Sequence, residues 1–191
     1  MSLALPSEIL LNHRSGAQRV FTLMRCRTDH LEVIERLQDR VLTCMHDSSL
    51  FVPETREELM ESLESDYCLG AFFEGELAMF TLMITNRPTE RNLGHAVGWS
   101  DDYLKKVVTY DSTFVAPEFR GYGLQRLSYP YKKAEALRLD AKEALASVAP
   151  ENSHSLNNLL SQGFDILDRR LLYGGRDRFI LNKHLGKERL L

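Results

Sequence analysis

The sequence predicts an α/β protein in which helices flank one mixed, mostly antiparallel sheet. Two observations carry this prediction. Segments rich in β-branched and aromatic residues alternate with amphipathic segments of helical length, and their order along the chain is β-α-α-β-β-β-α-β-α-β-β. Because no linker, repeat or low-complexity run interrupts the 191 residues, we expect a single domain over 19–183. A lead-in over 1–18 and a tail over 184–191 flank it.

Capping patterns define the elements of the first half. Thr28 or Asp29 can cap a helix whose apolar residues recur at helical spacing to about residue 45. Thr55 followed by Glu58 is a capping box, which predicts the start of a second helix that ends near residue 65. The segments around these helices favour β structure, and the last two form a hairpin. We expect strands over 19–27, 67–73 and 77–85.

Glycines mark the elements of the second half. A Val-rich strand is expected near the centre of the sheet, and two glycines follow it before a helix. Gly163 with Phe164 predicts the C-cap of a later helix, which Asn152 or Ser153 caps at its start. The long connection over 87–105 contains Trp99, which either selects a ligand or anchors the loop. We expect strands over 107–116, 144–149, 164–173 and 178–182, and helices over 121–140 and 152–162.

Composition and spacing argue against several classes of protein. A formal net charge of −3 gives no support for binding nucleic acid or an anionic membrane. The chain contains no apolar run of about 18 residues and no signal-peptide pattern, so we expect a cytoplasmic protein without a membrane partner. The three cysteines form no CxxC pair and the six histidines show no ligand spacing, so no metal site is expected.

The segment Asp111–Gln125, DSTFVAPEFRGYGLQ, carries the clearest functional signal. It predicts a buried strand, a turn marked by proline, and two glycines directly ahead of a helix. Gly121 and Gly123 allow a tight bend and let the backbone approach a ligand. The first amides of a helix have no intrahelical partner, and the helix dipole is positive at that end. The sequence therefore predicts a site in which main chain binds a phosphate or pyrophosphate.

With these elements in order, the chain resembles the GNAT superfamily of acyl-CoA N-acyltransferases over about residues 19–183. The family signature R/Q-x-x-G-x-G/A lies between the fourth strand and the third helix. Here it reads RGYGLQ over 120–125, with Gln125 where a small residue is usual. A second family pattern, an asparagine ahead of Gly-Phe, is met by Asn152 and Gly163-Phe164.

The resemblance implies that acetyl-CoA is the co-substrate. Backbone groups of Phe114 and Val115 would pair with the pantetheine and polarise the thioester carbonyl. Asn152, with Ser155 nearby, can bind the same arm, cap its helix, or do both. The other implied contacts come from the signature: Arg120, Gly121, Tyr122, Gly123, Leu124 and Gln125. Within this set Arg120 is either a phosphate contact or a surface arginine, and we expect the Tyr122 side chain to be exposed, near the adenine or solvated.

The usual catalytic residues of the family are missing. Leu159 stands where a tyrosine acid is common, and Ser147 where some members have a glutamate. Three residues are candidates in their place. Asp111 is either a base or amine anchor, or a carboxylate paired with a nearby arginine or lysine. His154 is a proton carrier or an exposed first-turn histidine, and Tyr173 is a replacement acid or a packing residue of the hairpin.

Two functions remain open at this point. The first is an acetyl-CoA-dependent N-acetyltransferase in which an amine, on a small molecule or a peptide amino terminus, attacks the acetyl group directly. The missing tyrosine and glutamate favour the second, an acyl-CoA-binding sensor or assembly domain without turnover. A nucleotide-binding loop is argued against, because the pattern GxxxxGK[ST] is absent. Acceptor, acyl length and the choice between monomer and homodimer stay open, although the C-terminal hairpin offers an edge strand for another copy.

Overall fold

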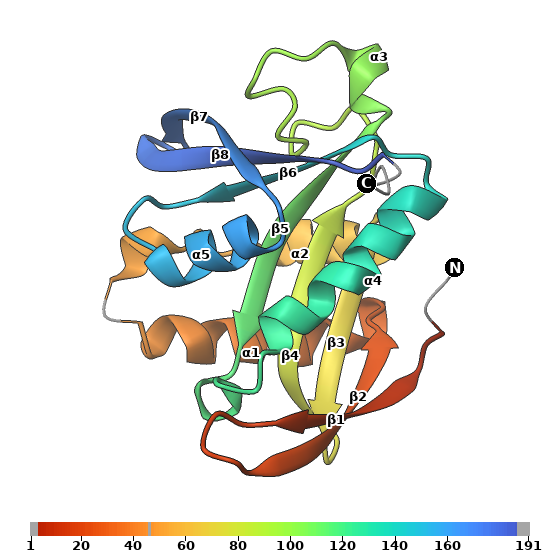
Figure 1. Ribbon diagram of the computed structural model, residues 1–191, viewed down its shortest axis with the longest axis vertical. Coiled ribbons are helices and arrows are strands. Elements are labelled where there is room, and N and C mark those ends of the chain that lie inside the picture. Colours follow the sequence, from red (N-terminus) through yellow and green to blue (C-terminus); the bar gives the residue numbers. More distant parts are fainter. Residues whose placement is uncertain (1–3, 46, 187–191) are drawn as a thin grey trace, which may run out of the picture. The chain divides into compact units, whose positions relative to one another are not determined.

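The computed structural model describes residues 4–45 and 47–186. Its strands form one mixed sheet in the order β1-β2-β3-β4-β5-β6-β8-β7, flanked by helices (Figure 1), so the predicted fold class is confirmed. The strands are β1 (Ser7–Asn12), β2 (Gln18–Arg25), β3 (Tyr67–Phe73), β4 (Glu76–Ile84), β5 (Val107–Val115), β6 (Glu143–Val148), β7 (Asp165–Leu172) and β8 (Arg176–His184). The helices are α1 (Leu31–Thr43), α2 (Arg56–Ser65), α3 (Asp101–Leu104), α4 (Leu124–Arg138) and α5 (Ser153–Ser161). Three 3-10 turns complete the list: η1 (Thr28–His30), η2 (Ser48–Leu50) and η3 (Pro117–Phe119).

The described chain divides into two compact units, each assembled from separate stretches of sequence. Unit 1 contains residues 4–45, 53–82 and 112–131. Unit 2 contains residues 47–52, 83–111 and 132–186. Strands β4 and β5 and helix α4 contribute residues to both, so no linker separates the units along the chain. The expected domain limits at residues 19 and 183 stay predictions, and the tail beyond residue 186 lies outside the described residues.

Unit 1 corrects the expected lead-in. Residues 7–12 form strand β1, which pairs antiparallel with β2 from Ser7↔Leu23 to Asn12↔Gln18. The sequence signal is weak because β1 lies at the margin of the sheet, where its residues alternate between half-buried and exposed and none is fully buried. The predicted order of elements along the chain was therefore wrong at its start, where it lacked strand β1.

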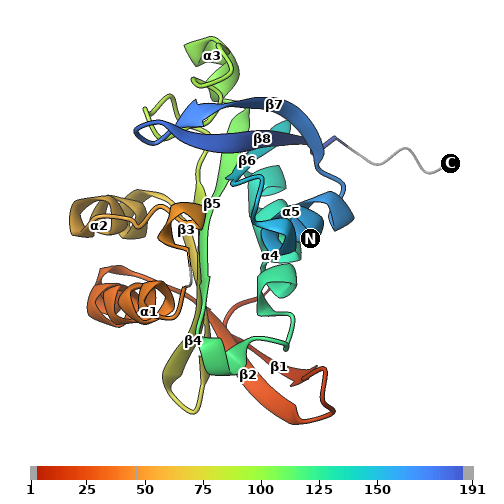
Figure 2. The ribbon, with the colours of Figure 1, turned by 90° about the vertical axis from the view of Figure 1, so that its left-hand side faces the viewer.

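Helices cover both faces of the unit 1 strands. Figure 2 shows α1 and α2 together on one face of β3 and the start of α4 on the other. Helix α1 buries Leu31, Ile34, Leu37 and Val41. Its predicted cap was wrong, because the chain first makes the 3-10 turn η1 with Arg27 as cap. The predicted capping box of α2 is confirmed: the Glu58 N–H donates to Thr55 Oγ1 (3.2 Å) and the Thr55 N–H donates to Glu58 Oε2 (2.7 Å).

Unit 2 places β6 between a parallel and an antiparallel neighbour. β6 pairs with β5 in parallel and with β8 antiparallel, and β7 lies beyond β8 at the margin of the sheet (Figure 1). Leu93, Val107, Leu145 and Ile180 form a buried cluster against which Trp99 packs, so the anchoring role of Trp99 is confirmed. Within the described residues no helix has the length and apolarity of a membrane span.

Local sequence patterns predicted only some features of the second half of the chain correctly. The C-cap at Gly163 is confirmed: its φ is +81°, and the Phe164 N–H donates back to the Leu159 carbonyl at 3.3 Å. In α4, by contrast, Leu137 is an exposed apolar residue. Helix α4 contributes residues to both units, and its buried positions include two tyrosines, a serine and a lysine, which an apolar periodicity does not identify.

Candidate functional site

The chain between β5 and α4 forms an open loop with two left-handed glycines. After η3, Arg120 is extended, and φ is +91° at Gly121 and +76° at Gly123. The Leu127 N–H donates to the Gly123 carbonyl at 3.0 Å, so the first intrahelical bond of α4 begins at Gly123. The first N–H groups of a helix have no intrahelical acceptor and lie at its positive end. This is the geometry predicted for a phosphate site.

The two glycines are needed for different reasons. A Cβ at Gly121 would lie 2.4 Å from His13 Nε2, and the Arg14 N–H donates to the Gly121 carbonyl at 3.2 Å. Gly121 therefore lets the β1–β2 turn pack against the loop. At Gly123 a Cβ would have no atom within 4 Å. The main chain there is therefore open on the side where a Cβ would lie.

The side chain of Tyr122 is not exposed as expected. It is buried, with its ring centroid 4.9 Å from that of His13 and 5.4 Å from that of Phe21. The Arg19 guanidinium lies 5.6 Å from the same ring. The expectation of an exposed side chain near adenine or solvent was wrong, because an aromatic cluster of unit 1 takes up the ring. The neighbouring Arg120 side chain is exposed, which leaves it available for a phosphate.

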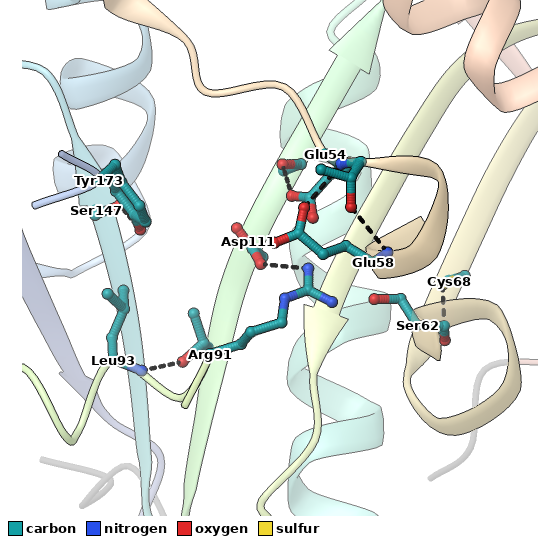
Figure 3. A network of polar contacts seen from close by, with 12 residues as sticks. Glu54, Glu58, Ser62, Cys68, Arg91, Leu93, Asp111, Ser147 and Tyr173 are labelled. Carbon is teal, nitrogen blue, oxygen red and sulfur yellow. Dashed lines mark hydrogen bonds and ion pairs between the residues drawn. The ribbon is translucent and has the colours of Figure 1, made fainter. Parts of the chain in front are cut away.

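The parallel ladder between β5 and β6 ends just before Asp111. It runs from Val107↔Glu143 to Tyr110↔Ala146, whereas both strands continue beyond these residues. Asp111 Oδ2 lies 3.3 Å from Arg91 Nη2 in a partly buried ion pair (Figure 3). The alternative of a carboxylate paired with an arginine is therefore confirmed for Asp111. Its role as base or anchor stays a prediction.

Unit 1 contains a carboxylate that the sequence reasoning missed. The Ser112 hydroxyl, on β5, donates to Glu54 Oε1 at 2.5 Å. The backbone of Glu54 is fixed by the buried side chain of Gln38, which donates to its carbonyl (2.9 Å) and accepts from its N–H (2.8 Å). The only local signal is a glutamate directly before a capping box. Contact with a strand 58 residues away could not be read from the sequence.

In unit 2 two hydroxyl groups come together. Tyr173 Oη lies 2.9 Å from Ser147 Oγ, and both residues are labelled in Figure 3. Tyr173 has a φ of +51° in the turn between β7 and β8, and its hydroxyl group contacts Ser147 of β6. Ser147 occupies the position of the missing family glutamate. The sequence singled out each residue, and the structure shows that they form a pair.

At the start of α5, the structure shows the predicted helix cap at Asn152. Asn152 caps the helix, its Oδ1 accepting from the Ser155 N–H at 3.1 Å. His154 is exposed, with Nε2 3.4 Å from the amide nitrogen of Asn158. The exposed first-turn alternative is thus confirmed for His154. Leu159 is buried in the core and offers no chemistry.

No protein-family model and no curated protein matches the sequence. Solved structures do match. A Salmonella typhimurium protein solved with its cofactor acetyl-CoA superimposes with a TM-score of 0.67 at 16% identity, over 88% of this chain and 95% of that one. A GNAT-family acetyltransferase from Streptococcus pneumoniae gives a TM-score of 0.65 at 15% identity, over 87% and 99% of the two chains. The ribosomal-protein-S18-alanine N-acetyltransferase of Escherichia coli gives 0.64 at 16%, over 90% and 99%.

The chain has the GNAT fold. The fold that the resemblance implied is therefore confirmed. In the GNAT fold the RGYGLQ loop occupies the signature position between strand and helix, here β5 and α4. The sequence patterns thus lie on the expected elements. The contacts of Glu54 and His13 were not predicted from the sequence. Among the described residues, no group of three or more His, Cys, Asp and Glu side chains is arranged to hold a metal ion.

Proposed function

We propose that the protein is an acetyl-CoA-dependent N-acetyltransferase that acts by direct attack of an amine. The observation that carries this proposal is the main-chain loop at Gly121–Gly123, opening α4 within a GNAT fold. A phosphate-bearing donor held by backbone would explain the open main chain at Gly123 and the few charged side chains of the loop. The Salmonella neighbour with acetyl-CoA supports the choice of donor.

Donor binding is assigned to the loop and to the strand that precedes it. The amides at the start of α4 would hold the pyrophosphate, and Arg120 would add a charged contact. Main-chain groups of Phe114 and Val115 would pair with the pantetheine and polarise the thioester carbonyl, on which negative charge develops. Asn152 caps α5 and can in addition bind the pantetheine arm, with Ser155 beside it.

We assign the base to Glu54 in preference to Asp111. Glu54 accepts a short hydrogen bond from the Ser112 hydroxyl, and the Asp111 carboxylate forms an ion pair with the guanidinium of Arg91. An incoming ammonium would have to compete with that guanidinium for Asp111. The Glu54 carboxylate can accept the proton that the ammonium must lose before its nitrogen attacks. Asp111 remains a candidate anchor, and His154 remains a candidate base.

We assign the acid to the hydroxyl pair Tyr173–Ser147. In the reaction a C–N bond forms between the amine and the acetyl carbon, and the C–S bond of the thioester breaks. The amine loses one proton and the departing thiolate gains one. A tyrosine hydroxyl that is hydrogen-bonded to a second hydroxyl can supply that proton, in place of the tyrosine that is common at the position of Leu159. The acceptor is an amine of a small molecule or a peptide, and we expect no nucleic-acid or membrane partner.

The competing function is an acyl-CoA sensor or assembly domain. Buried Leu159 and the replacement at Ser147 favour it, because both usual catalytic side chains are missing. The two functions share the donor site and differ only in turnover.

The test combines binding with turnover. Purified protein is titrated with acetyl-CoA by calorimetry, and release of free coenzyme A thiol is then followed with a panel of amines and short peptides. Binding with amine-dependent thiol release supports the transferase. Binding without release across the panel favours the sensor, and no binding contradicts both.

Free thiols of the chain are expected to stay reduced, as in a cytoplasmic protein.

A further inference from the structure

Strand β7 is the most exposed strand of unit 2 and lies at the margin of the sheet. Its burial pattern contains no fully buried residue. Nine large apolar side chains are exposed among the described residues, and four of them fall within 166–173. They are Ile166, Leu167, Leu171 and Tyr173. An edge strand with unpaired backbone groups and exposed apolar side chains is a surface on which another strand can pair.

The register with β8 shows which β7 side chains share a face. Directly opposite residues of an antiparallel pair point to the same side. The register shifts between Ile166 and Asp168, so Leu167 is an extra residue at a β-bulge. As a consequence Ile166, which pairs with Leu181, lies on the same face as Leu171, which pairs with Asp177. Without the bulge, residues five apart would lie on opposite faces.

Charged side chains of β7 form ion pairs within the β7–β8 hairpin. Arg169 binds Asp177 of β8, with Nε 3.1 Å from both carboxylate oxygens. Arg170 binds Asp168, with Nε 2.9 Å from Oδ2. The strand DILDRRLL therefore carries two acidic and two basic residues and no net charge. Edges that are protected against pairing usually carry unbalanced charge, such as lysines.

We propose that β7 pairs antiparallel with β7 of a second copy of this chain, about a two-fold axis at Arg169. In this register Asp168 faces Arg170 of the partner subunit, and Ile166 faces Leu171 of the partner subunit, each twice by symmetry. The two Arg169 side chains meet at the axis, and each is neutralised by its own Asp177. The bulge at Leu167 keeps the apolar pair on one face.

Neighbouring registers are less favourable. An axis at Asp168 opposes two aspartates and places Ile166 against the partner's Arg169. An axis at Arg170 opposes two arginines and places Leu171 against the partner's Arg169. Each of the three registers opposes two like charges at its axis, so the flanking pairs decide between them. Only the axis at Arg169 matches apolar with apolar and acid with base. The strand is thus self-complementary in one register.

The test is the oligomeric state of the full chain, measured by sedimentation velocity from about 1 to about 200 µM, where mass action reveals a reversible dimer. We expect a dimer in wild type. Ile166→Lys and Leu171→Glu should each weaken it by at least about tenfold, since each removes two symmetric apolar contacts. The double variant places Lys opposite Glu across the axis and should recover most of the dimer. Both positions are exposed, so folding is retained, which circular dichroism checks.

Two controls make the proposal specific. Leu10→Glu alters an equally exposed leucine on β1, the other margin of the sheet, and should leave the dimer intact. In a Cys44→Ser background, Arg169→Cys should form an intermolecular disulfide with itself, whereas Asp165→Cys, away from the axis, should not. A monomer at every concentration overturns the proposal. So does a dimer that Leu10→Glu abolishes and Ile166→Lys does not.

Discussion

The phosphate loop of unit 1 and the hydroxyl pair of unit 2 represent two ways of building a functional group. The loop depends on backbone conformation: two glycines with positive φ and the start of a helix. The pair depends on side chains, Ser147 and Tyr173, that lie 26 residues apart and meet at 2.9 Å. The loop follows from a short stretch of sequence, whereas the pair depends on the course of the β7–β8 hairpin. Substitutions should therefore act differently in the two regions.

The largest effect is expected at Gly121. Gly121→Val would place its Cβ 2.4 Å from His13 Nε2 and impose a φ of +91° on a β-branched residue. We expect a loss of about 2–4 kcal/mol of unfolding free energy and no measurable acetyl-CoA binding. Chemical denaturation and calorimetry check this.

Three alanine substitutions distinguish the steric clash at Gly121 from the backbone strain at Gly123. Gly123→Ala meets no atom within 4 Å and should cost only about 1–2 kcal/mol, from the left-handed backbone. His13→Ala should partly rescue Gly121→Ala, since it removes the clashing imidazole. Additive effects of these two substitutions would contradict the assigned contact.

A large effect confined to turnover is expected at Glu54. Glu54→Gln keeps the hydrogen bond with Ser112 and removes the base. We expect kcat to fall by about 10²–10⁴-fold while acetyl-CoA affinity stays within about twofold. Steady-state kinetics and calorimetry measure the two quantities. Glu57→Gln, exposed on α2, is the control. A greater loss for Asp111→Asn than for Glu54→Gln would return the base to Asp111.

A smaller effect is expected for the acid. Tyr173→Phe removes the hydroxyl but keeps the ring, and should lower kcat by about 10–100-fold, because a thiolate leaves without full protonation. Ser147→Ala should lower it less. The double variant should be no worse than Tyr173→Phe alone, because both residues act through one hydrogen bond. Wild-type rates in Tyr173→Phe would assign the residue to packing of the hairpin.

The smallest effect concerns the cysteines. Cys44 is exposed, whereas Cys26 and Cys68 are buried, and burial raises the pKa of the Cys26 thiol to about 12. One thiol should react with a disulfide reagent in the native state, and all three after denaturation. Because the unfolded thiol ionises near pH 9.0 and the buried Cys26 thiol near 12, the free energy of unfolding should fall as pH rises from 9.0 toward 12. Rapid native labelling of Cys26 would contradict its burial.

Features encoded by adjacent residues could be predicted from the sequence. The capping box at Thr55, the C-cap at Gly163 and the glycine loop each depend on a few neighbouring positions, and each was found in the structure. Strand β1 was missed because a marginal strand buries too little to show apolar alternation. Tyr122 was misplaced because its partners, His13 and Phe21, belong to distant strands and turns.

The catalytic candidates were the least predictable part. Ser112 lies in the segment that was singled out, but its partner Glu54 is fixed by Gln38, a buried polar residue that no periodicity identifies. Asp111 was proposed as a base, but Arg91, from a long connection, is its partner. Side-chain pairs of this kind depend on where whole elements pack, and capping or glycine patterns carry no information about that.

The central claim is that backbone at the start of α4 binds the phosphates of the donor. Its most direct test is a calorimetric comparison of acetyl-CoA with S-acetylpantetheine, which has the thioester and the pantetheine arm but lacks the nucleotide and its phosphates. The account predicts that acetyl-CoA binds and that S-acetylpantetheine loses at least about 100-fold in affinity, or about 2.7 kcal/mol. Equal affinity for the two compounds would show that the loop does not hold the donor, and would contradict the account.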